Sequence, residues 1–114
     1  MVKGYVPSQG DIVFVQLDPQ VGKEQRGRRP AVVISPKSYN KKVGLSLMCP
    51  ITSRVKGYPF EVVLPPNAKT HGVIMVDQIK SQDWKARNTR FVEKLSDEAL
   101  NNVIYQLMVL IGRQ

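Results

Sequence analysis

The sequence predicts a small, mainly β domain that carries one amphipathic helix at its C-terminal end. The chain has 114 residues, a length that fits a single domain. Its first two-thirds contains short apolar runs separated by glycine and proline, and its last segment repeats apolar residues with a helical period. We therefore expect one domain over residues 1–114, in which the strands form a small barrel or an open sheet.

Each expected strand is rich in β-branched, aromatic or other apolar residues and is bounded by turn-forming residues. The run Asp11–Leu17 follows Gly10 and precedes Asp18-Pro19. The run Ala31–Ser35 is almost continuously apolar, which is typical of a buried strand. Three further strands are predicted at Leu45–Ile51, Phe60–Leu64 and Gly72–Ile79, and a short helical turn at Ser81–Arg87.

The C-terminal helix is predicted from its periodicity and from its ends. Ser96 is a good N-cap, and Asp97 and Glu98 place negative charge in the first turn, where the helix dipole favours it. Leu95 and Leu100 hold the positions of a hydrophobic staple, and Gly112 that of the residue after the helix. We expect the apolar stripe to join the core, with docking of a partner helix as the alternative. The stripe consists of Leu100, Val103, Ile104, Leu107, Leu110 and Ile111.

Positive charge is concentrated in the first half of the chain. The net charge is +8, and residues 1–60 hold ten basic and three acidic residues. The main clusters are Lys23–Arg29, which ends the long connection that begins at Asp18, and Lys37–Lys42. This excess favours a polyanionic partner such as a nucleic acid, although basic charge can also serve solubility alone.

Several classes of site and of cellular location are excluded or disfavoured by composition. A single cysteine, Cys49, and a single histidine, His71, exclude a disulfide framework and disfavour metal cages and a Ser-His-Asp triad. Motifs that bind nucleotides through a glycine-rich loop are absent from the sequence. We expect no cofactor and no metal. No apolar run suggests a secretory signal or a membrane span, so we expect a cytoplasmic protein.

Cleavage of RNA is one reaction that needs only the side chains present, because the nucleophile, a 2′-hydroxyl, belongs to the substrate. The protein must supply a base, an acid and stabilisation of charge on phosphorus. Glu24, a lone acid among basic residues, is a candidate base, and Arg29, held extended by Pro30, suits the phosphate. Thr52 could donate to a phosphate oxygen. The alternative roles are a salt bridge for Glu24, a surface position for Arg29 and a strand-end hydrogen bond for Thr52.

These residues carry a resemblance to a known family over essentially the whole chain. The segment Glu24–Pro30 (EQRGRRP) is the most specific part, and Pro50–Ser53 and Lys56–Val62 extend the match. The sequence resembles the MazF/PemK family of bacterial toxin endoribonucleases, and its N-terminal and KGYPFEV blocks resemble the MazF branch. Further matching blocks are Val6–Ile12, Asp18-Pro19 with Gly22, Ala31–Val33, Ser35-Pro36 with Tyr39-Asn40, Gly72-Val73, Asp77-Gln78 and Trp84–Arg87.

The resemblance implies an SH3-like β-barrel, a homodimer, and sequence-specific, metal-independent cleavage of single-stranded mRNA. The products would carry 2′,3′-cyclic phosphate and 5′-hydroxyl ends, and translation would stop. It also implies a MazE-like antitoxin whose acidic C-terminal segment covers the RNA groove. By position it assigns the catalytic roles to Arg29 and Thr52, with Glu24 associated with activity. Met75 replaces an arginine of the PemK branch, and Arg28 replaces a histidine of close relatives.

Other residues are candidates for binding RNA rather than for cutting it. Basic side chains would contact phosphates, and Tyr58 could stack on a base, although we expect it to pack instead. Trp84 is expected in the core, His71 in a loop, and Cys49 to be buried and inert. The RNA-binding candidates are Gln25, Arg26, Arg28, Ser53, Arg54, Lys56, Tyr58, Asp77, Gln78 and Arg87.

Three alternatives remain open from the sequence. The first is a nucleic-acid-binding module that does not cut. The second is a toxin of the CcdB group, which shares the barrel and poisons DNA gyrase; the EQRGRRP block and Thr52 weigh against it. The third is a structural or partner-docking protein.

Overall fold

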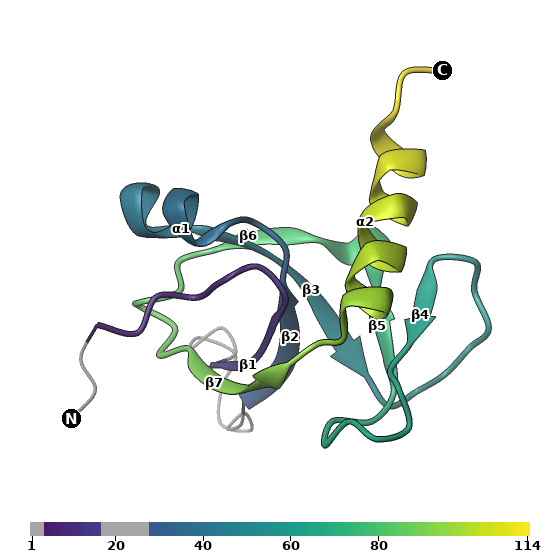
Figure 1. Cartoon of the computed structure of the whole chain (residues 1–114), viewed down its shortest axis with the longest axis horizontal. Helices are drawn as coiled ribbons and strands as arrows, with labels where there is room; N and C mark the ends of the chain where they lie inside the picture. Colours follow the sequence, from purple (N-terminus) through teal and green to yellow (C-terminus); the bar gives the residue numbers. More distant parts are fainter. Residues whose placement is uncertain (1–3, 17–27) are drawn as a thin grey trace, which may run out of the picture.

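The computed structural model describes residues 4–16 and 28–114, and all structural statements concern these residues. They form an antiparallel sheet with one helix on each of two sides (Figure 1). The helices are α1 (Lys37–Val43) and α2 (Asp97–Ile111), and a 3-10 turn, η2, spans Val76–Gln78. The strands are β1 (Asp11–Gln16), β2 (Arg28–Val33), β3 (Ser46–Thr52), β4 (Glu61–Val63), β5 (Val73–Met75), β6 (Lys80–Gln82) and β7 (Arg90–Lys94).

The sheet has the order β4-β5-β3-β2-β1-β7, and β6 also pairs with β3. The start of β3 pairs with β6 and its end with β5, so two short strands share one neighbour. The turn η2 separates those two strands. The expected single strand Gly72–Ile79 is therefore wrong in its second half, where the chain bends in η2 before it resumes pairing.

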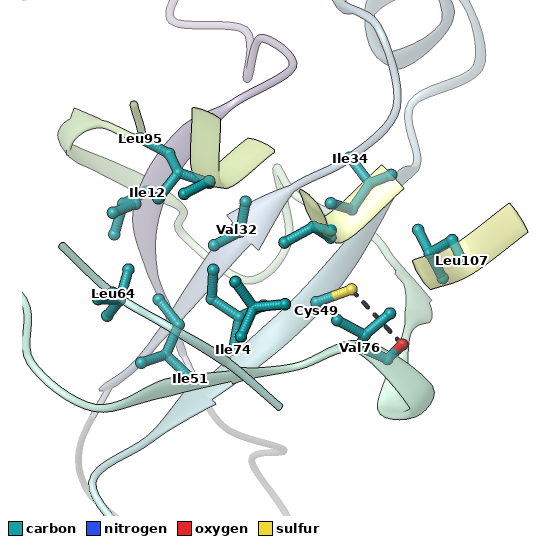
Figure 2. Close-up of a cluster of buried hydrophobic side chains, with 13 residues drawn as sticks. Ile12, Val32, Ile34, Cys49, Ile51, Leu64, Ile74, Val76, Leu95 and Leu107 are labelled. Atoms are coloured by element: carbon teal, nitrogen blue, oxygen red, sulfur yellow. Dashed lines mark hydrogen bonds between the residues drawn. The ribbon is translucent and has the colours of Figure 1, made fainter. Parts of the chain in front are cut away.

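Both faces of the central strands are buried, which explains their continuous apolar runs. Helix α2 covers a main core. This core includes Ile12, Val32, Cys49, Ile51 and Val103 (Figure 2). Alternate residues of the same strands point to the opposite face. They form a smaller core there with Trp84, which consists of Val13, Val15, Ala31, Val33, Met48 and Trp84. The buried indole of Trp84 donates from Nε1 to the carbonyl oxygen of Asn40, 3.0 Å away, which confirms the expected core position.

Cys49 is fully buried in the main core, as expected. Its thiol lies 3.8 Å from the carbonyl oxygen of Val76, toward which it donates (Figure 2). Burial, and to a lesser degree the charge of Asp77, raise the pKa of Cys49 to about 12. The thiol therefore stays protonated at neutral pH, consistent with the predicted inertness.

The C-terminal helix begins as predicted. The Ser96 hydroxyl accepts a hydrogen bond from the Ala99 N–H at 3.2 Å, and Leu95 and Leu100 both join the main core. Gly112 directly follows the helix, as expected, and its backbone is extended with φ −65°. Only the first part of the stripe is core: Val103 and Leu107 are buried, whereas Leu110 and Ile111 are exposed. Neither described helix is long and apolar enough to cross a membrane.

Three further elements differ from the sequence prediction. The basic cluster Lys37–Lys42 lies in α1, which we did not predict, and β7 was also missed. The first two residues of the expected helical turn Ser81–Arg87 belong to β6, and turns follow them. Helix α1 is held by Asn40, whose fully buried side chain bonds Ser35 and the carbonyl oxygen of Pro7. The predicted class, a mainly β protein of the small-barrel kind with a C-terminal helix, is confirmed.

Candidate active site

Two adjoining hollows meet near the start of β2. One reaches the end of β3, and the other reaches β6, which pairs with the start of β3. Arg29 and Pro30 line both hollows and thus form their common boundary. We name them the Thr52 hollow and the Gln82 hollow. The Thr52 hollow is lined by Arg29, Pro30, Ile51, Thr52, Ser53, Arg54 and His71. The Gln82 hollow is lined by Val15, Gln16, Arg29, Pro30, Ala31, Met48, Pro50, Gln78, Lys80, Ser81, Gln82 and Arg87.

Arg29 is positioned by the register of β2. It pairs with Val15 of β1, and Pro30 after it keeps the backbone extended. Side chains alternate along a strand, so Arg29 shares a face with Ala31, which belongs to the smaller core away from α2. Arg29 itself is exposed. Its guanidinium is therefore carried on a fixed strand and is free to meet a ligand.

Thr52 is the last residue of β3, where it pairs with Val73 of β5. Its Oγ1 accepts a hydrogen bond from the backbone N–H of Arg54 at 3.1 Å. A hydroxyl that accepts one hydrogen bond still has its own proton to donate. The structure thus brings Arg29 and Thr52, which are far apart in sequence, to the same hollow.

The loop of residues 53–60, which follows Thr52, is shaped by the Glu61 carboxylate. Its Oε1 accepts from the N–H of Gly57 at 2.9 Å, and both oxygens lie within 3.3 Å of the N–H of Lys56. Gly57 has φ +79°, a conformation that favours glycine. This carboxylate holds the backbone of a loop that presents Arg54 and Lys56.

The loop of residues 64–72 borders the same hollow and is held by Glu93 of β7. The Glu93 carboxylate accepts from the N–H groups of Lys69 and Thr70, at 3.1 and 2.9 Å, and from the Thr70 hydroxyl at 3.0 Å. Desolvation by itself raises the pKa of Glu93. These donors and the Lys69 charge lower it, and the net pKa lies below that of an ordinary glutamate.

Gly72 joins this loop to Thr52 at close range. Its φ is +122°, and a Cβ atom at this position would overlap the backbone carbonyl of Thr52. Only glycine fits such an approach without a shift of one of the two strands. Gly72 therefore fixes the distance between the end of the 64–72 loop and the predicted catalytic threonine.

The remaining predicted residues fall into distinct groups. Ser53 and Arg54 line the Thr52 hollow, and Gln78 and Arg87 line the Gln82 hollow. Lys56, Tyr58 and Asp77 are exposed but are not among the lining residues, and Arg28 pairs with Gln16 at the start of β2. Glu24, Gln25 and Arg26 lie outside the described residues.

Tyr58 requires a correction. We expected its ring to pack, but the side chain is 59% exposed, with the Lys56 ammonium 5.8 Å from the ring centroid. The neighbouring Phe60 packs against the main core instead. The loop backbone held by Glu61 turns Tyr58 outward, a consequence that the apolar pattern of the sequence did not reveal.

Sequence reasoning missed lining residues of both hollows. His71 was taken as an ordinary loop residue, yet it faces the hollow that holds Arg29 and Thr52. Lys80 and Gln82 are brought to the second hollow by the pairing of β6 with β3. Residue 71 lies close to Thr52 because Thr52 pairs with Val73. The local sequence pattern does not predict this pairing.

A small β-rich fold with an arginine-containing hollow, in a chain of net charge +8, is typical of proteins that bind polyanions. Comparison with known proteins narrows this class. Residues 8–111 match the family model described as "PemK-like, MazF-like toxin of type II toxin-antitoxin system". The chain therefore belongs to this toxin family, which confirms the resemblance inferred from the sequence.

Relatives and solved structures agree with this membership. The chain is 46% identical over 112 residues to "Endoribonuclease toxin MazF" of Escherichia coli (strain K12), covering 98% of this chain and 100% of that protein. It is 33% identical to "Endoribonuclease PemK" of Escherichia coli, covering 90% of this chain and 80% of that protein. A MazE-MazF crystal structure from Deinococcus radiodurans matches with a TM-score of 0.87 at 39% identity, covering 97% of this chain and 100% of the matched chain.

Proposed function

We propose that this chain is the endoribonuclease toxin of a type II toxin–antitoxin system. It cuts single-stranded mRNA at a specific sequence, without a metal, and leaves 2′,3′-cyclic phosphate and 5′-hydroxyl ends. The observation that carries the proposal is the meeting of Arg29 and Thr52 in one hollow, on strands β2 and β3. The chemistry of RNA cleavage selected both residues from the sequence, and relatives named endoribonucleases support the reaction class.

In this mechanism Arg29 stabilises the charge that develops on phosphorus. A guanidinium donates to two phosphate oxygens at once and remains charged throughout the reaction. Its place on a paired strand limits the reorganisation needed when the transition state forms. Thr52 donates its hydroxyl proton to a non-bridging oxygen, while its own oxygen accepts from the Arg54 N–H.

Glu24 is the proposed base for the 2′-hydroxyl. It precedes Arg29 by five positions in a basic segment outside the described residues. The RNA chain passes from the Thr52 hollow across Arg29 into the Gln82 hollow, so that the scissile phosphate lies at their boundary. Gln78 and Arg87 in the second hollow then contact the adjoining nucleotide, as Arg54 does in the first.

The protein acts in the cytoplasm as a homodimer, and a MazE-like antitoxin inhibits it by laying an acidic segment over both hollows. Support for a dimer comes from exposed apolar side chains in the second half of α2, where Tyr105, Met108 and Ile111 are 65%, 63% and 77% exposed. Support for an antitoxin comes from the similarity to a MazF chain solved together with MazE. The net charge of +8 suits an acidic inhibitor.

The test is incubation of the protein with a defined single-stranded RNA in EDTA, followed by mapping of 5′-hydroxyl ends. We expect discrete cuts from the parent, none from Arg29→Ala, and parental cutting from Arg90→Ala, a β7 arginine that lines neither of the two hollows. Cleavage by Arg29→Ala above a few percent of the parent rate would contradict the assignment. Intact RNA with a gel shift would favour a binding module, and inhibition of DNA supercoiling without RNA cleavage would favour a gyrase-directed toxin.

A further inference from the structure

We propose that His71 is the general acid that protonates the leaving 5′-oxygen. This inference rests on the proposed function, because it names a second participant in the same reaction. Departure of a 5′-alkoxide requires a proton, and an Arg acid would be a poor donor because the guanidinium does not deprotonate in proteins. An imidazole exchanges a proton near neutral pH, which suits it for this step.

The backbone on both sides of His71 is anchored. On one side, Thr70 gives its N–H and its hydroxyl to the Glu93 carboxylate, at 2.9 and 3.0 Å. On the other side, Gly72 lies against the Thr52 backbone, and Val73 pairs with Thr52 in the sheet. His71 is thus held beside Thr52 by contacts of the residues before and after it, while its own side chain stays exposed.

The composition of the Thr52 hollow leaves His71 as the suitable proton donor among its described lining residues. The other polar residues there are Arg29, Thr52, Ser53 and Arg54. A guanidinium and an aliphatic hydroxyl both hold their protons too tightly to act as acids at neutral pH. The remaining lining residues are Pro30 and Ile51, which carry no exchangeable side-chain proton.

The charges around His71 are compatible with this role. Arg29 of β2 and Arg54 after β3 line the same hollow as His71, and in the proposed function both contact RNA phosphates. Lys69 lies two residues before it, and the Glu93 carboxylate of β7 is occupied by the Lys69 and Thr70 donors. Because the Glu93 carboxylate already accepts these hydrogen bonds, we expect the negative charge beside a protonated His71 to come from the bound RNA phosphate.

The proposed step transfers two protons, one to Glu24 and one from His71. The 2′-oxygen forms a bond to phosphorus and its proton passes to Glu24. The bond from phosphorus to the 5′-oxygen breaks, and that oxygen keeps the electron pair and takes a proton from the imidazolium of His71. The products are the cyclic phosphate and the 5′-hydroxyl, and solvent returns a proton to His71 and accepts the one held by Glu24.

The test compares two substrates with the parent and with His71→Asn. One substrate is a natural RNA, and the other carries sulfur in place of the bridging 5′-oxygen at the mapped cut. A thiolate leaves without protonation, so only the oxygen substrate needs the acid. We expect His71→Asn to cut natural RNA about 100-fold more slowly than the parent, within the usual range for loss of a general acid. We expect its rate on the sulfur substrate to lie within about threefold of the parent rate.

Arg29→Ala is the control, because charge develops on phosphorus with either leaving group, and we expect it to be slow on both substrates. Equal slowing of His71→Asn on both substrates would make His71 structural and would overturn the proposal. Parental cutting of natural RNA by His71→Asn would do the same. If the parent protein cut neither substrate, the proposed function itself would be wrong, and this inference, which rests on it, would be wrong as well. Thermal unfolding of His71→Asn should match the parent, since the side chain is exposed.

Discussion

In each of the two loops that border the Thr52 hollow, a glutamate carboxylate accepts hydrogen bonds from backbone N–H groups. The two glutamates differ in how far along the sequence they lie from their loops. In the 53–60 loop, Glu61 binds the N–H groups of Lys56 and Gly57, four or five residues earlier in the chain. In the 64–72 loop, Glu93 binds the N–H groups of Lys69 and Thr70 from another strand, 23 or 24 residues later. The first loop is thus shaped locally, whereas the second depends on the position of β7 in the sheet.

We expect the 53–60 loop to contribute to RNA binding and the 64–72 loop to contribute to the cleavage step. The locally held loop presents two cations, Arg54 and Lys56, which contribute to the general attraction to RNA phosphates. The loop tied to the sheet carries His71 and contacts Thr52 through Gly72, where small displacements are costly to a reaction. Changes to the 64–72 loop should therefore reduce the rate of cleavage, and changes to the 53–60 loop should weaken RNA binding.

Among changes to these two loops, the largest effect is expected from Gly72→Ala, which breaks the contact between the 64–72 loop and Thr52. The added Cβ would overlap the Thr52 carbonyl at a φ of +122°. We expect a loss of about 3 kcal/mol in the free energy of unfolding and a kcat about 100-fold lower at a temperature where the variant is folded. Urea unfolding and single-turnover cleavage measure the two effects.

Gly44→Ala is the matched control for this change. Its φ is +85°, but an added Cβ would have no atom within 4 Å, so the substitution introduces backbone strain without a collision. We expect a loss of about 1 kcal/mol and unchanged cleavage. If both variants lost activity to the same degree, the contact of Gly72 with Thr52 would not be what matters.

A smaller effect is expected at Glu61, where two substitutions separate hydrogen bonding from charge. Glu61→Gln keeps an oxygen that can accept from the Gly57 N–H, whereas Glu61→Leu does not. We expect the Leu variant to raise KM about tenfold with little change in kcat, and the Gln variant to bind RNA as well as the parent or better. Tighter binding by both variants would show that only the negative charge of Glu61 matters.

Arg54→Ala and Lys56→Ala should each weaken RNA binding by a few-fold. If each side chain neutralises one phosphate, the slope of log affinity against log salt should fall by about 0.7 for each variant. Fluorescence anisotropy with a 2′-O-methyl RNA, which cannot be cut, measures this slope. Lys42→Ala, an exposed lysine on α1, is the control and should leave the slope unchanged.

The smallest effect concerns the dependence of stability on pH. Because the pKa of Glu93 is lowered in the folded state, its ionisation stabilises the protein above about pH 4.3, the unfolded value, and this contribution disappears as pH falls through the folded pKa. Glu93→Gln should therefore lose less stability than the parent between pH 6 and pH 3. Parallel curves of unfolding free energy for the two proteins would contradict this expectation.

The parts of the molecule that were predictable from sequence are those with local causes. The α2 start follows from Ser96 and the apolar period, and the core strands follow from their β-branched runs. By contrast, α1 depends on Asn40 and its bonds to Ser35 and Pro7, and it carries no apolar stripe that could have revealed it. Strand β7 pairs with β1, from which it is separated by most of the sequence, and its own sequence carries little apolar alternation.

The candidate site divides in the same way. Arg29 and Thr52 could be selected from their residue types, from the adjoining proline and strand, and from the family resemblance. His71, Lys80 and Gln82 could not, because they reach the hollows through pairing of β5 and β6 with β3. Such pairing depends on the bend at η2, which the sequence pattern of residues 72–79 presents as one continuous strand.

The buried thiol of Cys49 has a practical consequence for spectroscopy. The chain has one cysteine, and it is enclosed in the main core in its protonated form. Maleimide dyes and spin labels react with accessible thiolates, so the unmodified protein should remain unlabelled under native conditions. A cysteine introduced at an exposed position near either hollow would then carry the reporter alone. The protein is thus ready for single-site labelling without first removing its native cysteine.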